Sequence, residues 1–66
     1  MTLPEAVAAY LGASINLSAA EMGRAWAARD GVGYAAACTW VARARDDLAV
    51  ATDQLVTAAL EHDCEA

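Results

Sequence analysis

The side chains best suited to metal binding lie near the C-terminus, in the segment Glu61-His62-Asp63-Cys64-Glu65. His62 is the only histidine, and Cys38 is the only other cysteine. A structural zinc site needs four ligands, and residues two apart point to different sides of a helix. Because His62 and Cys64 would need a second chain to complete such a site, we expect no bound metal. Cys38 is interpreted as a small buried apolar residue, since about 39 Å of helix would separate it from Cys64.

Potential catalytic side chains do not occur in a pattern that would support a reaction. Ser14 and Ser18 are predicted to lie in a loop and at a helix start, and one terminal histidine cannot act as the base for both. Asp46 and Asp47 are neighbours, and neighbouring side chains of a helix diverge by about 100°. This pair is therefore interpreted as part of a solvated helix face. The sequence predicts no enzyme active site and no cofactor.

Charge is unevenly distributed along the chain. The net charge is −5, and the four basic residues, all arginines, lie at or before position 45. Duplex nucleic acid is bound by neutralising phosphates with lysine and arginine, so it is a poor candidate partner. A protein with a basic surface is a better one, because the last third of the chain is anionic. The acidic residues of this part are Asp46, Asp47, Asp53, Glu61, Asp63 and Glu65.

The alanine-rich composition and the helix-start signals predict an all-α fold, in which two short helices precede one long C-terminal helix. The segment Thr2–Glu5 is typical of a capping box, and Gly12 is expected to end the helix that starts there. The segment Ser18–Glu21 is a second capping box, and Gly31 supports a turn before the long helix. The predicted helices of this single domain cover residues 3–11, 18–29 and 33–62.

The long predicted helix carries a seven-residue repeat, with large side chains at one position and alanine at another. Such a repeat is typical of a helix–helix contact, and alanine lets a second backbone approach closely. The helix would span about 43 Å, and neither short helix is long enough to cover it. We therefore predict a helical bundle completed by homodimerisation along this seam. The seam residues are Tyr34, Ala37, Val41, Ala44, Leu48, Ala51, Leu55 and Ala58.

Trp40 lies off this seam, on the side of Asp47 and Gln54, and the sequence leaves open whether its indole is core or exposed. An exposed tryptophan is a candidate anchor, because tryptophan is enriched at binding hot spots. With the anionic face, it predicts a small acidic protein-interaction module, a regulatory or inhibitory adaptor of phage or plasmid origin. The residues expected to face the partner are Trp40, Asp46, Asp47, Asp53 and Glu61.

A second interpretation starts from Ala27–Gly33 and Trp40–Arg45, which together resemble a helix-turn-helix segment. In that family an alanine-rich first helix ends in Gly-Val-Ser, and the recognition helix ends in Val-x-Arg. The resemblance implies a transcriptional regulator whose DNA binding depends on Arg43 and Arg45. The sequence departs from the pattern just after the turn, where residues 34–37 read Tyr-Ala-Ala-Ala.

A third interpretation concerns the acidic C-terminus. Glu61, Asp63 and Glu65 stand at a helix end where the dipole favours cations, so these residues are either a frayed end or a contact for a basic partner. In a stronger form, the chain would be an inhibitor whose carboxylates imitate nucleic-acid phosphates. Asp47 and Glu61 share one helix face, as such mimicry requires.

Targeting and membrane signals are not evident in the sequence. The first five residues contain no basic residue and no long apolar segment. The longest uncharged run, residues 6–20, includes Gly12 and Asn16, and is shorter than the roughly 20 apolar residues that a membrane span needs. We expect a cytoplasmic protein with reduced thiols and no membrane contact.

Overall fold

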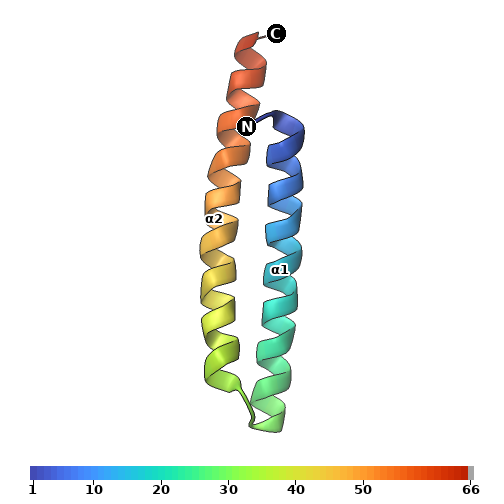
Figure 1. Ribbon diagram of the computed structural model, residues 1–66, viewed down its shortest axis with the longest axis vertical. Coiled ribbons are helices and arrows are strands. Elements are labelled where there is room, and N and C mark those ends of the chain that lie inside the picture. Colours follow the sequence, from blue (N-terminus) through green and yellow to red (C-terminus); the bar gives the residue numbers. More distant parts are fainter. Residues whose placement is uncertain (66) are drawn as a thin grey trace.

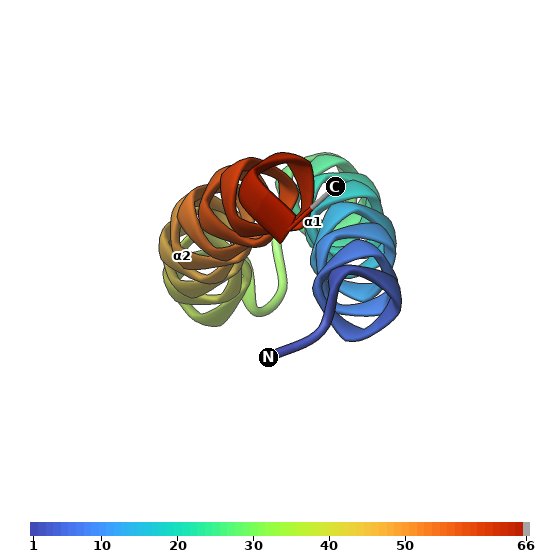
Figure 2. The ribbon, with the colours of Figure 1, turned by 90° about the horizontal axis from the view of Figure 1, so that it is seen from above.

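A computed structural model describes residues 1–65 and has the form of a hairpin of two antiparallel helices (Figure 1). Helix α1 covers Leu3–Asp30, and helix α2 covers Tyr34–Glu65. The hairpin is a rod of 53 × 13 × 12 Å, and no strand occurs within residues 1–65. Seen from one end, the two helices coil around each other along their length (Figure 2). The all-α prediction is confirmed.

Helix α1 begins at the capping box that the sequence indicates. The Thr2 hydroxyl accepts a hydrogen bond from the Glu5 amide at 3.3 Å, and the Glu5 carboxylate accepts one from the Thr2 amide at 3.3 Å. The Thr2 hydroxyl also donates to this carboxylate at 2.8 Å. The bonds from the Thr2 side chain and backbone hold the pKa of Glu5 below its ordinary value, the side-chain bond having the larger effect.

The prediction that Gly12 ends the first helix is wrong. Helix α1 passes through Gly12, and Ser18 lies exposed within this helix instead of capping a second one. Glycine inside a helix costs roughly 0.5–1 kcal/mol, but tertiary packing of a helix face outweighs such local terms. Tyr10 and Leu17, on either side of Gly12, are half-buried in the hairpin. The first two predicted helices are therefore one continuous helix.

The predicted turn around Gly31 is present. Gly31 has a φ of 73°, a left-handed conformation that glycine adopts without steric cost, and its amide donates to the Ala27 carbonyl at 2.8 Å. Gly33 has the same φ, and α2 starts at the next residue. The long helix is confirmed, with its observed end at Glu65 instead of the predicted residue 62.

The predicted seam of α2 packs against α1 of the same chain. Val41 and Ala44 form a buried cluster with Ala20, and Leu17 packs against this cluster. The other seam positions are buried or half-buried, except Tyr34 beside the turn, which is 50% exposed. The seam is thus a real helix–helix contact, and it lies within one hairpin.

Helix α1 carries the same alternation of large residues and alanines as α2. Along α1, every seventh residue is large or long, and the residue three places later is alanine. An alanine of one helix therefore faces a larger residue of the other at each level of the contact. Because α1 has 28 residues, it covers the seam that the two predicted short helices could not, and the length mismatch that led to the dimer prediction disappears. The larger residues are Leu3, Tyr10, Leu17 and Arg24, and the alanines are Ala6, Ala13, Ala20 and Ala27.

Candidate functional site

Trp40 lies on α2 beside the seam, and its indole lies across α1. Its Nε1 donates to Asn16 Oδ1 at 3.2 Å. A Cβ atom at Gly23 would lie 3.0 Å from Trp40 Cζ3, so the ring packs directly over this glycine. The side chain is still 42% exposed. The indole is therefore fixed by α1 on one side and open on the other, which answers the question that the sequence left open.

Two of the four predicted acidic residues lie on the same side of α2 as Trp40. Asp47 and Glu61 follow Trp40 at multiples of seven residues, so they project from α2 in nearly the same direction. Asp46 and Asp53 lie about 100° further round α2, and Arg43 and Val50 lie between them and this row; all four carboxylates are exposed. We refer to the row of Trp40, Asp47, Gln54 and Glu61 as the acidic side. The row of α1 that borders it contains no basic residue and consists of Ala9, Asn16, Gly23 and Asp30.

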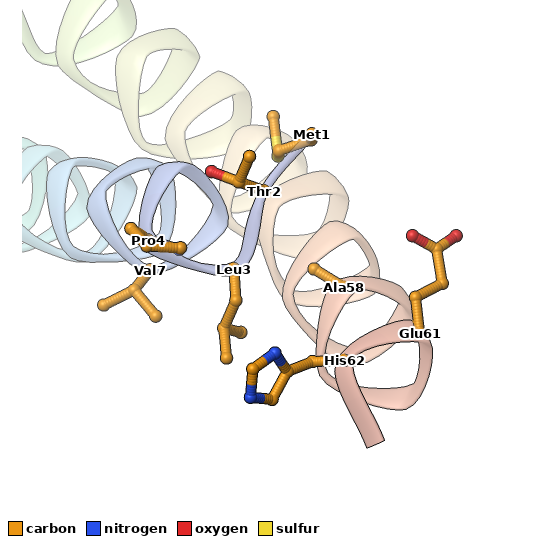
Figure 3. A pocket seen from close by; sticks show the side chains of 8 residues that line it. All are labelled: Met1, Thr2, Leu3, Pro4, Val7, Ala58, Glu61 and His62. Carbon is orange, nitrogen blue, oxygen red and sulfur yellow. The ribbon is translucent and has the colours of Figure 1, made fainter. Parts of the chain in front are cut away.

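A groove of about 660 Å³ lies where the start of α1 meets the last turns of α2 (Figure 3). The His62 side chain extends toward Leu3, whereas the Glu61 carboxylate points away from the imidazole (Figure 3). These two side chains therefore do not form an acid–base pair. The residues that line the groove are Met1, Thr2, Leu3, Pro4, Val7, Ala58, Glu61 and His62.

The cysteines lie far apart in the hairpin and carry free thiols. Cys38 is half-buried near the start of α2, and Cys64 is exposed near its end. Within the described residues, no group of three or more His, Cys, Asp or Glu side chains is arranged to hold a metal ion. Because Cys38 is half-buried, its interpretation as a buried residue is confirmed only in part.

The face of α1 that points away from α2 is apolar. Ile15 is 70% exposed and Met22 is 64% exposed. Leu11 and Trp26 lie on the same face, and the Arg29 guanidinium lies 5.9 Å from the centre of the Trp26 ring. We refer to this surface as the outer face of α1. The loop predicted between residues 11 and 18 hid this face, although the spacing from Leu11 to Trp26 fits one helix face.

Comparisons with known proteins do not assign this chain to a family. No protein-family model matches it, and neither a curated protein nor a solved structure gives a significant match. Within residues 1–65, neither helix contains a stretch long and apolar enough to cross a membrane.

Proposed function

We propose that this chain is a small acidic protein-interaction module, which acts as a regulatory or inhibitory adaptor by binding a partner with a basic surface. The proposal is carried by one observation: Trp40 is fixed by α1 yet 42% exposed, in a row of α2 that contains Asp47 and Glu61, with Arg43 as the single arginine next to this row. An indole that is already positioned loses little conformational freedom on binding. The negative charges of the neighbouring carboxylates steer a basic partner toward the indole. The proposed mechanism is steric occlusion of the partner's basic surface.

The small core of the hairpin also supports an interaction role. Among residues 1–64, the buried residues are five alanines and Val41. Hydrophobic stabilisation scales with the apolar area that is removed from water, and an alanine side chain contributes little of it. A bound chain would stabilise the folded hairpin by mass action. We propose that the working form is a homodimer, which then engages the basic partner.

The two nucleic-acid interpretations have less support from the geometry. The helices of a helix-turn-helix motif cross at about 90–120°, whereas α1 and α2 are antiparallel and lie side by side (Figure 1). A phosphate mimic needs closely spaced negative charges, and Gln54 separates Asp47 from Glu61 within the row. We therefore favour a basic protein surface as the partner.

Site-specific photo-crosslinking tests the acidic side as the binding surface. A photoreactive amino acid replaces Gln54, which lies in the row of Trp40, and the matched control replaces Ala49, which is exposed on another side of α2. We expect one protein from the native lysate to be crosslinked from position 54 but not from position 49. Crosslinking should weaken in the Asp47→Asn variant and at raised ionic strength. Equal yields from both positions, or no product from position 54, would contradict the proposal.

A further inference from the structure

We propose that two copies of this chain associate through the outer face of α1, with the two α1 helices antiparallel about a two-fold axis at the level of Leu17. The proposal rests on the self-association put forward above, and it names the surface and the register. The seam of α2 is not available for this contact, because Val41 and Ala44 are already buried against α1. The acidic side is not available either, since two copies of it would repel each other.

Helix α1 is apolar on more than the side that packs against α2. No charged residue occurs between Glu5 and Glu21, and the outer face of α1 lies within and just beyond this segment. A helix that is apolar all round is normally covered all round. In the hairpin only one side of α1 is covered, because Ile15 and Met22 remain largely exposed on the opposite side.

The outer face repeats the large–small alternation of the contact between α1 and α2. Ile15 and Met22 are seven residues apart, and Gly12 and Ala19 stand three places before them. Antiparallel pairing of this repeat with itself puts Ile15 opposite Ala19 of the second copy, and Met22 opposite Gly12 of the second copy. Each level then joins one large and one small residue. The space at Gly12 is open in the hairpin, since nothing lies within 4 Å of a Cβ built there.

The same register also matches the residues at both ends of the contact. Arg29 comes to lie opposite Glu5 of the second copy, and two-fold symmetry forms this pair of opposite charges twice. Trp26 comes to lie opposite Ala8 of the second copy, so the largest side chain of the face meets one of the smallest. This complementarity in size and charge favours a second copy over an unrelated partner on this face.

The surface area of the hairpin is consistent with an unpaired face. The chain exposes 4656 Å², whereas a compact monomer of 6.8 kDa exposes about 3950 Å². The excess is about 700 Å², which approaches the roughly 800 Å² that each partner buries in a stable interface. One further helix contact along α1 would therefore bring the exposed area close to that of a compact protein.

Sedimentation equilibrium of the full chain tests this interface. Ile15→Glu places a carboxylate opposite Ala19 of the other copy, on both sides of the two-fold axis. We expect this variant to raise the dimer Kd at least about 100-fold. The matched control is Val50→Glu on the outside of α2, which is 55% exposed and should leave the Kd within about threefold. Circular dichroism checks that both variants keep their helix content. A wild-type chain that stays monomeric at roughly 100 µM, or a dimer that persists in Ile15→Glu, would overturn the proposal.

Photo-crosslinking from position 54 in the Ile15→Glu variant separates this proposal from the proposed function. Partner capture by a monomeric Ile15→Glu chain would show that the acidic side works by itself. If a wild-type dimer captures no protein from position 54, the proposed function is contradicted, whereas the proposed dimer interface is not.

Disulfide trapping tests the register, in a chain that also carries Cys38→Ser and Cys64→Ser. The proposed axis passes beside Ser18, so Ser18→Cys brings the two new thiols within bonding reach. Ala25→Cys lies on the same row of α1, and in an antiparallel dimer its two copies are about 20 Å apart. We expect a crosslinked dimer from position 18 and none from position 25. Crosslinking at both positions, which a parallel dimer would give, or at neither, would overturn the antiparallel register.

Discussion

The indole ring of Trp40 occupies the space that a side chain at position 23 would fill, with Cζ3 at 3.0 Å from the place of a Cβ atom. Glycine is a poor helix former, so its presence in the interior of α1 requires a reason. The reason is the close approach of the ring, whose nitrogen is held by Asn16. Gly23 thus provides the space in which α1 positions the proposed anchor of the acidic side.

Gly23→Ala should expose this relationship in a double-mutant cycle with Trp40→Ala. Alanine gains roughly 0.5–1 kcal/mol over glycine inside a helix, and we expect this gain when the ring has been removed. With Trp40 present, the added Cβ displaces the ring, so the gain should be cancelled or reversed. Urea unfolding at one fixed protein concentration measures the four free energies. An equal effect of Gly23→Ala in both backgrounds would contradict the close packing.

Ala44 is fully buried in the cluster with Leu17, and the seam has no room for a larger residue at this level. Ala44→Leu should force the helices apart and lower the free energy of unfolding by about 1–3 kcal/mol. The matched control is Ala42→Leu, which places the same side chain at an exposed position of α2 and should change stability by less than about 0.5 kcal/mol. Thermal unfolding followed by circular dichroism compares the two variants. A stable Ala44→Leu chain would mean that this level is not closely packed.

The structure shows which features a sequence pattern can reveal. The capping box of Thr2 and the turn at Gly31 were predicted correctly, because each depends on residues next to each other in the chain. The continuation of α1 through Gly12 depends on α2, whose packing outweighs a local stop signal, so neighbouring residues could not reveal it. The repeat from Leu3 to Ala27 was visible in the sequence and would have predicted the continuous helix.

The candidate site was predictable in part for a similar reason. The spacing of Trp40, Asp47 and Glu61 was enough to place them on one side of a helix. The contact of Trp40 with Gly23 requires the register between the two helices, because a shift by one repeat would place the ring over a different residue. The exposed face at Ile15 was hidden by the predicted loop, so the outer face of α1 became visible only with the continuous helix.

Gly31 should tolerate a D-amino acid better than an L-amino acid. Its φ of 73° lies in the left-handed region, where an L-residue costs roughly 1–2 kcal/mol. We expect Gly31→Ala to lower the free energy of unfolding by about this amount. A synthetic chain with D-alanine at position 31 is the matched control, because a D-residue favours positive φ. Nothing lies within 4 Å of the Cβ atom of an L-residue at this position, so a clash does not explain a loss of stability in Gly31→Ala. Equal destabilisation by both alanines, measured by thermal unfolding, would show that strain at this position is not the cause.

The capping box should make the stability of the hairpin depend on pH in the acidic range. The Thr2 bonds lower the pKa of Glu5 in the folded chain, so folding favours the ionised carboxylate. This contribution is fully present above the ordinary pKa of a glutamate carboxyl, and it is lost as the pH falls through the lower folded-state pKa. Thr2→Ala removes the hydroxyl that contributes most, so it should raise the pKa of Glu5 and flatten this part of the melting-temperature profile. NMR titration of the Glu5 side-chain carbon measures the pKa directly, and an unchanged value in Thr2→Ala would contradict the assigned cause.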